Sequence, residues 1–388
     1  MRILYCALDQ HVPGTTGGSV HVAAVAEGLA ARGHDLHVAT QRGGAAFPEG
    51  PVRWHHLAPP LGISRLRFAR LPQVLALARR VRPDVVIERY HNFGGEGVRA
   101  AARTGALAVL EVNAPVVDYP GSPKHLLDRA LVVEPMRRWR EWQCRTADLL
   151  VTPAAAIVPG WIPRERIVEI EWGADTERFH PGAAGHVPFT RTPGRVVAVF
   201  AGAFRRWHGA IRLVEAVRLL QSRGQRSIEA VLIGDGPELP TVRRAAEGLE
   251  GVRCAGAVPH AAMPAALAAA DVGVAPFDVA AHPPLSLGFY WSPLKVFEYM
   301  ASGLPVVAPA VEGLSRILTD GDEGILYDPG STGGLADALE RLTDPDLRRT
   351  LGAAARDRVV RDFSWARHCE RLAEACQEAL VGRKPRAR

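Results

Sequence analysis

Short apolar runs alternate with amphipathic stretches from the start of the chain. The runs predict buried strands, and the stretches between them, whose apolar residues recur every three or four positions, predict helices. In chain order, the elements predicted for the first half are strand 2–8, helix 19–32, strand 35–40, strand 84–88, helix 96–103 and strand 108–112. This alternation is typical of a parallel, doubly wound sheet, so we predict an α/β fold.

A second series of the same kind begins at Arg195, after a Gly- and Pro-rich linker at 181–194. Its predicted elements include strand 196–200, helix 210–220, strand 230–233 and strand 272–277. A chain of 388 residues is long enough for two domains. We therefore place the domain boundary in the linker, with a first domain at 1–185 and a second that begins at 186.

Residues 286–309, SLGFYWSPLKVFEYMASGLPVVAP, carry the clearest candidate chemistry and predict a loop, a helix, a turn and a strand. Ser292 is expected to cap the helix, with Pro293 at the first helical position. Lys295 opposes the helix dipole in the first turn, which indicates an anionic ligand such as phosphate. Glu298, one turn later, can accept hydrogen bonds from a ribose diol. The alternative is a solvated Lys295–Glu298 pair on a core helix.

Composition narrows the class of protein without identifying it. The net charge of +6 is compatible with anionic ligands or a membrane surface, although a bias toward arginine could also produce it. Five cysteines without C-x-x-C spacing indicate a reducing, cytoplasmic location with no disulfide or structural zinc. We expect no signal peptide, and every apolar run is too short to span a membrane.

The stretch at 286–309 resembles the donor-binding segment of glycosyltransferase family 4, whose pattern in one large branch is SPLK-x-x-EYMA-x-G-x-P-V-V-A. The resemblance covers nearly the whole chain and includes ERY at 88–90, EVNAP at 111–115 and FRRWHG at 204–209. It implies the GT-B architecture, in which two Rossmann-like domains face each other across a cleft. It also implies that the second domain comprises 186–363 and that a last helix, at 364–388, returns to the first domain.

The resemblance further implies how a nucleotide diphosphate sugar, the donor, is bound. Ser292 to Lys295 and Arg205 would hold the diphosphate, and Glu298 would hold the ribose. The donor-binding candidates are Gly17, Gly18, Arg205, His208, Gly234, Val258, Ser292, Pro293, Leu294, Lys295 and Glu298. The catalytic candidates are Arg205, Lys295 and Glu298, because a departing diphosphate needs preorganised positive charge and a fixed nucleoside.

Three positions depart from the family pattern. Tyr290 stands where the first Glu of E-x7-E is usual, Ala203 replaces an Arg, and His208 replaces a Lys. Arg205 is close enough in sequence to substitute for the missing Arg. These departures leave open a second class of function, a catalytically weak nucleotide-sugar-binding partner subunit.

Acceptor-binding candidates follow the ends of two predicted strands: Glu88, Arg89 and Tyr90 at the first, Asn113 at the second, and Asp118 in the loop beyond it. Ligands of such sheets bind beyond the carboxyl ends of the strands. Each of these residues could equally be a satisfied loop residue.

The function implied is that of a retaining glycosyltransferase, which moves a hexose of the glucose or N-acetylglucosamine type from a UDP-sugar to a hydroxyl of a small polar or glycan acceptor. We expect no cofactor and no metal, because the D-x-D spacings at 320–322 and 344–346 include Gly and Pro and predict turns or caps. A nicotinamide-dependent oxidoreductase is disfavoured, since G-x-G-x-x-G is missing.

Two basic stretches, 65–82 and 137–145, allow weak peripheral membrane contact. Both stretches are explained at least as well as solvated helix faces, on which the long basic side chains cover apolar surface. No nucleic-acid-binding module supports a nucleic-acid partner.

Overall fold

The computed structural model describes residues 1–62, 69–131 and 134–383, and divides the chain into two compact units. Unit 1 contains residues 1–172, 290–292 and the segment from Trp365 on; unit 2 contains 173–289 and 293–364. The division falls at Gly173 rather than at residue 186, because residues that precede the linker pack within unit 2. Arg356 donates hydrogen bonds to the carbonyls of Thr176 and Phe179 at 2.9 and 2.8 Å.

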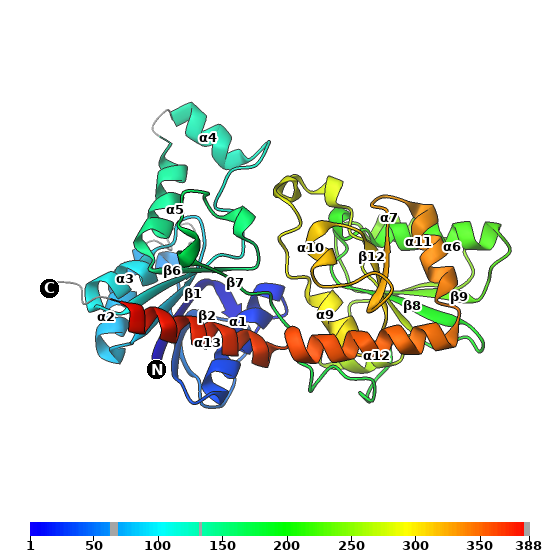
Figure 1. Cartoon of the computed structure of the whole chain (residues 1–388), viewed down its shortest axis with the longest axis horizontal. Coiled ribbons are helices and arrows are strands. Elements are labelled where there is room, and N and C mark those ends of the chain that lie inside the picture. Colours follow the sequence, from blue (N-terminus) through cyan, green and yellow to red (C-terminus); the bar gives the residue numbers. More distant parts are fainter. Residues whose placement is uncertain (63–68, 132–133, 384–388) are drawn as a thin grey trace. The chain divides into compact units, whose positions relative to one another are not determined.

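Unit 1 is built on a seven-stranded parallel sheet with the order β3-β2-β1-β4-β5-β6-β7 (Figure 1). Its strands are β1 (Arg2–Val12), β2 (Asp35–Arg42), β3 (Arg53–His56), β4 (Val85–Arg89), β5 (Leu107–Glu111), β6 (Leu149–Thr152) and β7 (Ile167–Glu169). Strands β4 and β5 are buried at every residue, as expected of a parallel sheet covered on both faces.

The α-helices of unit 1 are α1 (Gly17–Ala31), α2 (Leu71–Val81), α3 (Glu96–Thr104), α4 (Pro123–Leu131), α5 (Pro135–Thr146) and α13 (Trp365–Gly382). Short 3-10 turns are η1 (Pro60–Gly62), η3 (Ala155–Ile157) and η4 (Arg164–Arg166). Helix α13 packs against α1, so the end of the chain completes the first unit (Figure 1). The predicted basic stretch at 65–82 coincides with α2 only in part, and residues 65–68 lie outside the described residues.

Unit 2 holds a six-stranded parallel sheet with the order β10-β9-β8-β11-β12-β13. Its strands are β8 (Val196–Ala201), β9 (Ile228–Ile233), β10 (Val252–Gly256), β11 (Val272–Val274), β12 (Val306–Pro309) and β13 (Gly324–Tyr327). Its helices are α6 (Ala210–Ser222), α7 (Leu239–Ala246), α8 (Met263–Ala268), α9 (Leu294–Ala301), α10 (Glu312–Ser315), α11 (Thr332–Arg341) and α12 (Pro345–Asp362). The 3-10 turns are η5 (Arg206–His208), η6 (His260–Ala262), η7 (Val279–Ala281) and η8 (Pro283–Leu287).

The D-x-D spacings serve local structure, as the sequence predicts. Asp344 caps α12, its Oδ1 accepting from the backbone N–H of Asp346 at 2.9 Å. Asp320 Oδ1 accepts from the N–H of Leu326 at 2.8 Å.

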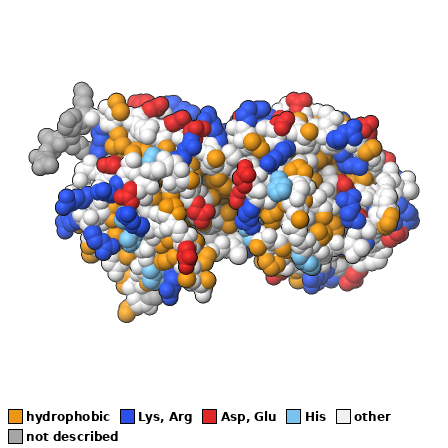
Figure 2. Space-filling model, turned by 90° about the horizontal axis from the view of Figure 1, so that it is seen from below, with side chains coloured by type: hydrophobic (Ala, Val, Ile, Leu, Met, Phe, Trp, Pro, Cys, Tyr) orange, Lys and Arg blue, Asp and Glu red, His pale blue; other side chains and the backbone are white. Residues whose placement is uncertain are grey.

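Two surface properties bear on partners. On the face shown in Figure 2, Lys and Arg side chains lie in small groups separated by acidic and apolar ones, so no continuous basic band covers the described part of this face. None of the helices in the described part of the chain has the length and apolar content that crossing a bilayer requires.

Candidate active site

Two glycines allow the carboxyl ends of β8 and β9 to approach closely in unit 2. Gly202, directly after β8, has φ of 142°, and Gly234, directly after β9, has φ of 133°. A Cβ on Gly234 would lie 1.9 Å from the carbonyl oxygen of Gly202. Only glycine fits such an approach. Gly234, one of the donor-binding candidates, therefore has a structural reason to be glycine whatever it binds.

Replacing Gly234 with alanine is expected to lower the unfolding free energy by about 1–3 kcal/mol, because the added Cβ must push the two strand ends apart. Gly224→Ala is the matched control: its φ of 83° is also positive, but no heavy atom lies within 4 Å of its Cβ position. Urea unfolding of both variants measures the difference. Equal losses would show that crowding at Gly202 does not matter.

Lys295 lies in the first turn of α9, and its ammonium points back to the end of β8. Nζ is 4.1 Å from the ring centre of Phe200 and 5.3 Å from that of Phe277. The residue is half-buried, but Nζ itself is buried and has no hydrogen-bond partner among the described residues. Burial lowers the pKa of Lys295 to about 7, although Glu298 opposes this shift. An unpaired buried ammonium is costly, and an anion beside it would remove that cost.

His208 lies next to this ammonium, and its Nδ1 is 2.7 Å from the carbonyl oxygen of Ala203. Burial, together with the charges of Lys295 and Arg205, lowers its pKa to about 3. The imidazole is therefore neutral near pH 7 in the protein without ligand. As a donor-binding candidate, His208 can contribute a hydrogen bond here but not a positive charge.

Arg205 is exposed, with its guanidinium 5.9 Å from the ring centre of Trp207. It forms no ion pair with a described residue, unlike Arg212, and it lines a cavity of about 220 Å³ together with Arg206 and Glu238. The charges of Arg205 and Lys295 both lower the pKa of His208, so the two cations predicted to hold a diphosphate lie within electrostatic range of the same ring.

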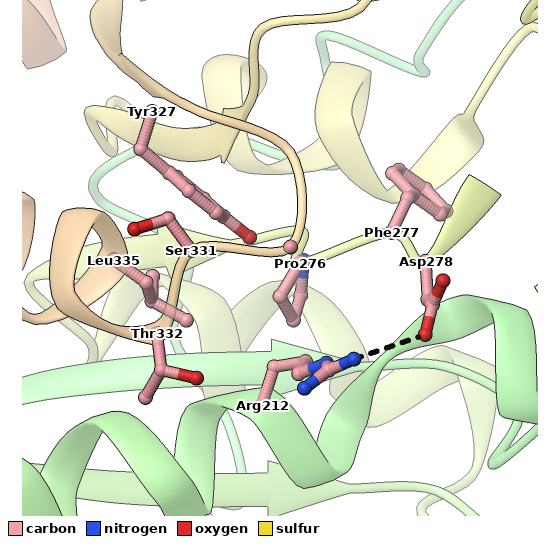
Figure 3. Close-up of a pocket in the computed structure, with 9 residues that line it drawn as sticks. Arg212, Pro276, Phe277, Asp278, Tyr327, Ser331, Thr332 and Leu335 are labelled. Carbon is pink, nitrogen blue, oxygen red and sulfur yellow. Dashed lines mark hydrogen bonds and ion pairs between the residues drawn. The ribbon is translucent and has the colours of Figure 1, made fainter. Parts of the chain in front are cut away.

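A second, much smaller cavity is lined by Phe277 and its neighbours in sequence, Pro276 and Asp278 (Figure 3). Arg212 faces into it from α6 and its guanidinium is 3.4 Å from the carboxylate of Asp278. Tyr327 closes it from the end of β13. With a volume of about 10 Å³ it has room for about one water molecule, which is too little for a nucleotide sugar.

Glu298 and the start of α9 complete the set of donor candidates in unit 2. No side chain caps α9, which begins at Leu294 after Pro293, so the first amides of this helix keep their hydrogen-bonding capacity. Glu298 Oε1 is 3.6 Å from His260 Nε2, and Val258 is half-buried two residues before that histidine. His260, Gly202 and the rings of Phe200 and Phe277 were not among the predicted site residues, because no motif marks them.

The prediction that Ser292 caps helix α9 is wrong. Helix α9 begins at Leu294, one residue later than predicted, so Pro293 stands at the cap position. Ser292 belongs to unit 1, where its hydroxyl donates to Glu171. Its Oγ also accepts from the N–H of Trp172 at 3.0 Å. A serine hydroxyl held in this way fixes the local path of the chain and does not cap α9.

Gly17, Gly18 and Tyr290 also belong to unit 1. The two glycines form the first turn of α1, which Thr16 caps by accepting from the N–H of Ser19. The helix therefore begins two residues before the predicted start. Tyr290 is buried, and burial raises the pKa of its hydroxyl to about 12.

Glu88, an acceptor-binding candidate, caps a helix in unit 1. Its carboxylate oxygens accept from the backbone N–H groups of Gly95 and Val98 at 2.6 and 2.7 Å, at the start of α3. The side chain is buried, and burial raises its pKa to about 7 although these hydrogen bonds oppose the shift. Both oxygens are thus used inside the unit.

The other acceptor candidates are partnered as well. Tyr90 is buried and donates to Asn92 at 3.3 Å. Asn113 Oδ1 accepts from Trp172 Nε1 at 3.0 Å, while its buried Nδ2 has no partner among the described residues. Asp118 is 2.9 Å from the guanidinium of Arg140. Asn113 is the candidate with hydrogen-bonding capacity to spare.

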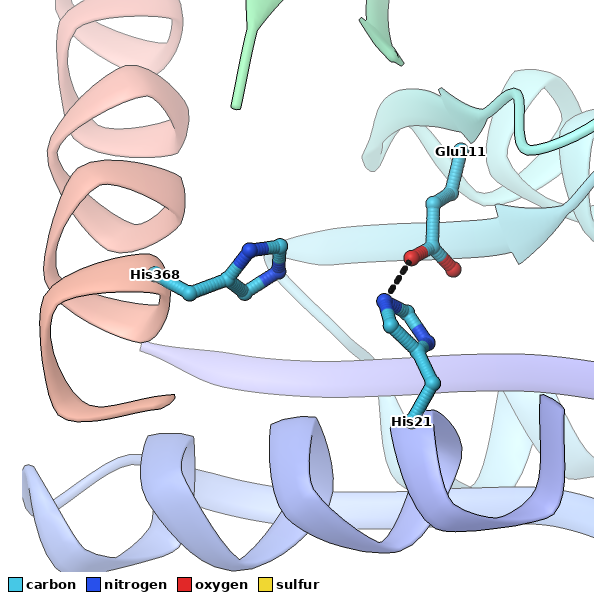
Figure 4. A group of neighbouring side chains, drawn as sticks. All are labelled: His21, Glu111 and His368. Carbon is cyan, nitrogen blue, oxygen red and sulfur yellow. Dashed lines mark ion pairs between the residues drawn. The ribbon is translucent and has the colours of Figure 1, made fainter. Parts of the chain in front are cut away.

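Arg89 belongs to a buried polar network that joins three segments distant in sequence: α1, β5 and α13 (Figure 4). Glu111 Oε1 is 2.8 Å from His21 Nε2, and Oε2 accepts from the Tyr5 hydroxyl at 2.5 Å. The Arg89 guanidinium lies 3.9 Å from Oε2. Burial alone would raise the pKa of Glu111, but these three neighbours outweigh it and hold the pKa below its usual range.

His368 approaches the network from α13, its Nδ1 2.8 Å from the carbonyl oxygen of Glu171. One ligand atom each from His21, Glu111 and His368 lies within 4.8 Å of the others. Both Glu111 oxygens are already partnered, however, and the nearby Arg89 charge opposes a cation. The group fits an ion-paired network better than a metal centre, and the absence of a metal from the reaction stays a prediction.

Comparison with known proteins matches both halves of the chain. Residues 15–178 match the family model Glycosyltransferase Family 4, and residues 195–344 match Glycosyl transferases group 1. The chain belongs to the family 4 glycosyltransferases. The D-inositol 3-phosphate glycosyltransferase of Corynebacterium aurimucosum is 31% identical over 253 residues, which are 60% of this chain and 58% of that relative. This family 4 chain thus matches little more than half the length of that protein.

A second relative and one solved structure are also similar to the chain. The alpha-D-kanosaminyltransferase of Streptomyces kanamyceticus is 25% identical over 327 residues, 79% of this chain and 81% of that protein. The solved structure of Anabaena HepE in complex with UDP has a TM-score of 0.70 at 18% identity and covers 97% of this chain and 100% of that chain. The likeness confirms the predicted fold class for this family 4 member, GT-B with two Rossmann-like domains.

Proposed function

We propose that the chain is a retaining glycosyltransferase that moves a hexose, of the glucose or N-acetylglucosamine type, from a UDP-sugar to a hydroxyl of a small polar or glycan acceptor. Membership of family 4 supports transfer from a nucleotide sugar. The choice of UDP is supported by the structurally similar HepE, which was solved in complex with UDP. The five free cysteines support a cytoplasmic location.

The observation that carries the proposal is the unpaired ammonium of Lys295. It lies beside His208 at the glycine-lined end of β8, where the sequence pattern of the family places the donor diphosphate. A protein gains nothing from burying a bare cation unless a ligand neutralises it. The β-phosphate of a UDP-sugar supplies that negative charge, and more of it develops as the bond to the sugar breaks.

The proposed mechanism follows from that charge. Lys295 and Arg205 stabilise the departing diphosphate, and the uncapped first turn of α9 donates backbone hydrogen bonds to it. The acceptor hydroxyl attacks from the face that the diphosphate leaves, so that the anomeric configuration is retained and a phosphate oxygen takes the proton. We assign the reaction no cofactor, no metal and no general base.

Glu298→Ala is expected to weaken UDP binding about 10–100-fold, because a carboxylate that accepts from a ribose hydroxyl contributes about 1.5–3 kcal/mol. Calorimetry with UDP and with 2′-deoxy-UDP tests the role directly. The unaltered protein should prefer UDP, and Glu298→Ala should lose most of that preference. A variant that still discriminates between the two nucleotides would remove Glu298 from ribose recognition.

A partner subunit that binds a nucleotide sugar without turning it over is the second candidate. The neutral His208 and the presence of Ala203 and Tyr290 at usual site positions favour it. Hydrolysis of UDP-glucose or UDP-N-acetylglucosamine by the purified chain, measured as UDP release, separates the two proposals. Release that Lys295→Met abolishes supports the transferase, whereas tight UDP binding without release from either donor supports the partner subunit.

A further inference from the structure

Helix α4 turns its apolar residues outward. Leu126, Leu127 and Leu131 have exposed fractions of 61%, 46% and 48%. Together with the exposed Ala130 they occupy spacings i, i+1, i+4 and i+5, which form one stripe along the helix. A helix on a soluble core normally buries such a stripe.

The residue that α4 buries is a carboxylate. Asp128, 2% exposed, is the buried residue of this helix. Its oxygens accept from the backbone N–H groups of Met136 and Arg137 at 2.8 and 2.9 Å, at the start of α5, and Oδ2 lies 3.6 Å from the guanidinium of Arg140. These contacts fix which face of α4 points inward. The outward position of the leucines is therefore a consequence of specific polar bonds and not of a loosely placed helix.

Basic side chains flank the apolar stripe. At 100° per residue, Lys124 lies at one edge of the stripe and Arg129 beyond the other. Arg129, and Arg138 at the start of α5, are exposed and form no ion pair with a described residue. Residues 123–146 contain six Lys or Arg against three Asp or Glu, and one of those acids is the buried Asp128. Figure 1 shows α4 beyond α5 and apart from the sheet of its unit.

We propose that α4 docks on an anionic phospholipid surface, with Leu126, Leu127 and Leu131 inserted among the acyl chains and the exposed Arg129 at the headgroups. Exposed leucines bordered by basic residues are what an interfacial helix requires. A second copy of the chain fits this surface poorly, since a two-fold contact would bring Arg129 or Lys124 against its own like charge. Docking does not depend on the proposed sugar transfer, because it is measured without a donor.

Co-sedimentation with vesicles tests the proposal. Vesicles of phosphatidylcholine that also contain phosphatidylglycerol should retain the full chain, and vesicles of phosphatidylcholine alone should retain much less. The double variant Leu126→Ser with Leu127→Ser should lower vesicle affinity at least about tenfold, and Arg129→Glu by about tenfold. Val360→Ser is the matched control, because Val360 is an apolar residue 44% exposed on a helix of unit 2. It should bind like the unaltered protein.

Circular dichroism and UDP affinity, both expected to be unchanged, show that the variants fold. Three results would overturn the proposal. The first is no binding of the unaltered chain to the anionic vesicles. The second is equal binding by the double leucine variant. The third is that the unaltered chain is a dimer, the double leucine variant is a monomer, and neither of the two binds vesicles. Helix α4 would then be a contact between copies of the chain.

Discussion

Lys295→Met is expected to lower the turnover of a UDP-sugar by at least about 100-fold. The ammonium is placed where charge develops on the departing diphosphate, and loss of one such preorganised group typically costs 10²–10³ in rate, about 3 kcal/mol. Methionine keeps the length and apolar body of the side chain, so the contacts with Phe200 and Phe277 are retained. Steady-state kinetics of UDP release, with donor at saturation, measures the effect.

The same substitution is expected to leave the ligand-free fold as stable as before or to stabilise it. Folding lowers the pKa of Lys295 to about 7, below an unfolded value of about 10.4. The buried ammonium therefore opposes folding at every pH below the unfolded value, most strongly below pH 7, and methionine removes that penalty. Lys124→Met is the control: burial lowers the pKa of Lys124 to about 8, but it lies in unit 1 and should keep normal turnover. Near-normal turnover by Lys295→Met would exclude Lys295 from the mechanism.

Glu111→Leu is expected to lower the unfolding free energy of unit 1 by about 3–5 kcal/mol. The substitution removes the carboxylate partner of the buried Arg89 guanidinium and leaves the Tyr5 hydroxyl without its acceptor. Breaking a buried ion pair from one side has this cost because the remaining charge stays away from water. Urea unfolding near pH 7 measures it. The control is Glu250→Leu. The ion pairs of Glu250 with Arg195 and Arg226 lie at the surface, so their loss should lower the unfolding free energy far less.

The stability contributed by Glu111 also has a defined pH dependence. Its pKa is depressed by folding, so its contribution is fully present above the unfolded value of about 4.3 and is lost as the pH falls through the folded value. The difference between the unaltered protein and Glu111→Leu should therefore shrink in acid. A difference that stays constant down to pH 3, or no loss at pH 7, would show that the network does not hold the unit together.

The positions of the donor-binding candidates within the fold could be predicted because these residues lie in short, contiguous patterns. The segment from Pro293 to Glu298 forms the start of one helix, and Gly234 stands directly after a buried strand, so local sequence places them. The alternation of apolar runs and amphipathic stretches was likewise sufficient to predict that both units contain a parallel sheet. These features depend on contacts close in sequence, which pattern reading captures.

The roles that sequence could not supply depend on partners far away in the chain. Ser292 looks like a helix cap until Glu171, 121 residues earlier, takes its hydroxyl. Glu88 looks like a ligand-binding residue in the sequence, but in the structure both of its oxygens accept hydrogen bonds from backbone N–H groups at the start of α3. His21 lies on an apolar helix face, and only the fold brings it to Glu111 and His368.

Proton uptake on UDP binding tests the central claim most directly. At pH 8 most of Lys295 is neutral in the free protein, and a diphosphate beside it should raise its pKa, whereas His208 starts too low to titrate there. Calorimetry at pH 8 in buffers of different ionisation enthalpy should therefore show uptake of about one proton per UDP by the unaltered chain and by Lys124→Met, and none by Lys295→Met. UDP that binds tightly to the unaltered chain without proton uptake would contradict the claim that Lys295 holds the diphosphate.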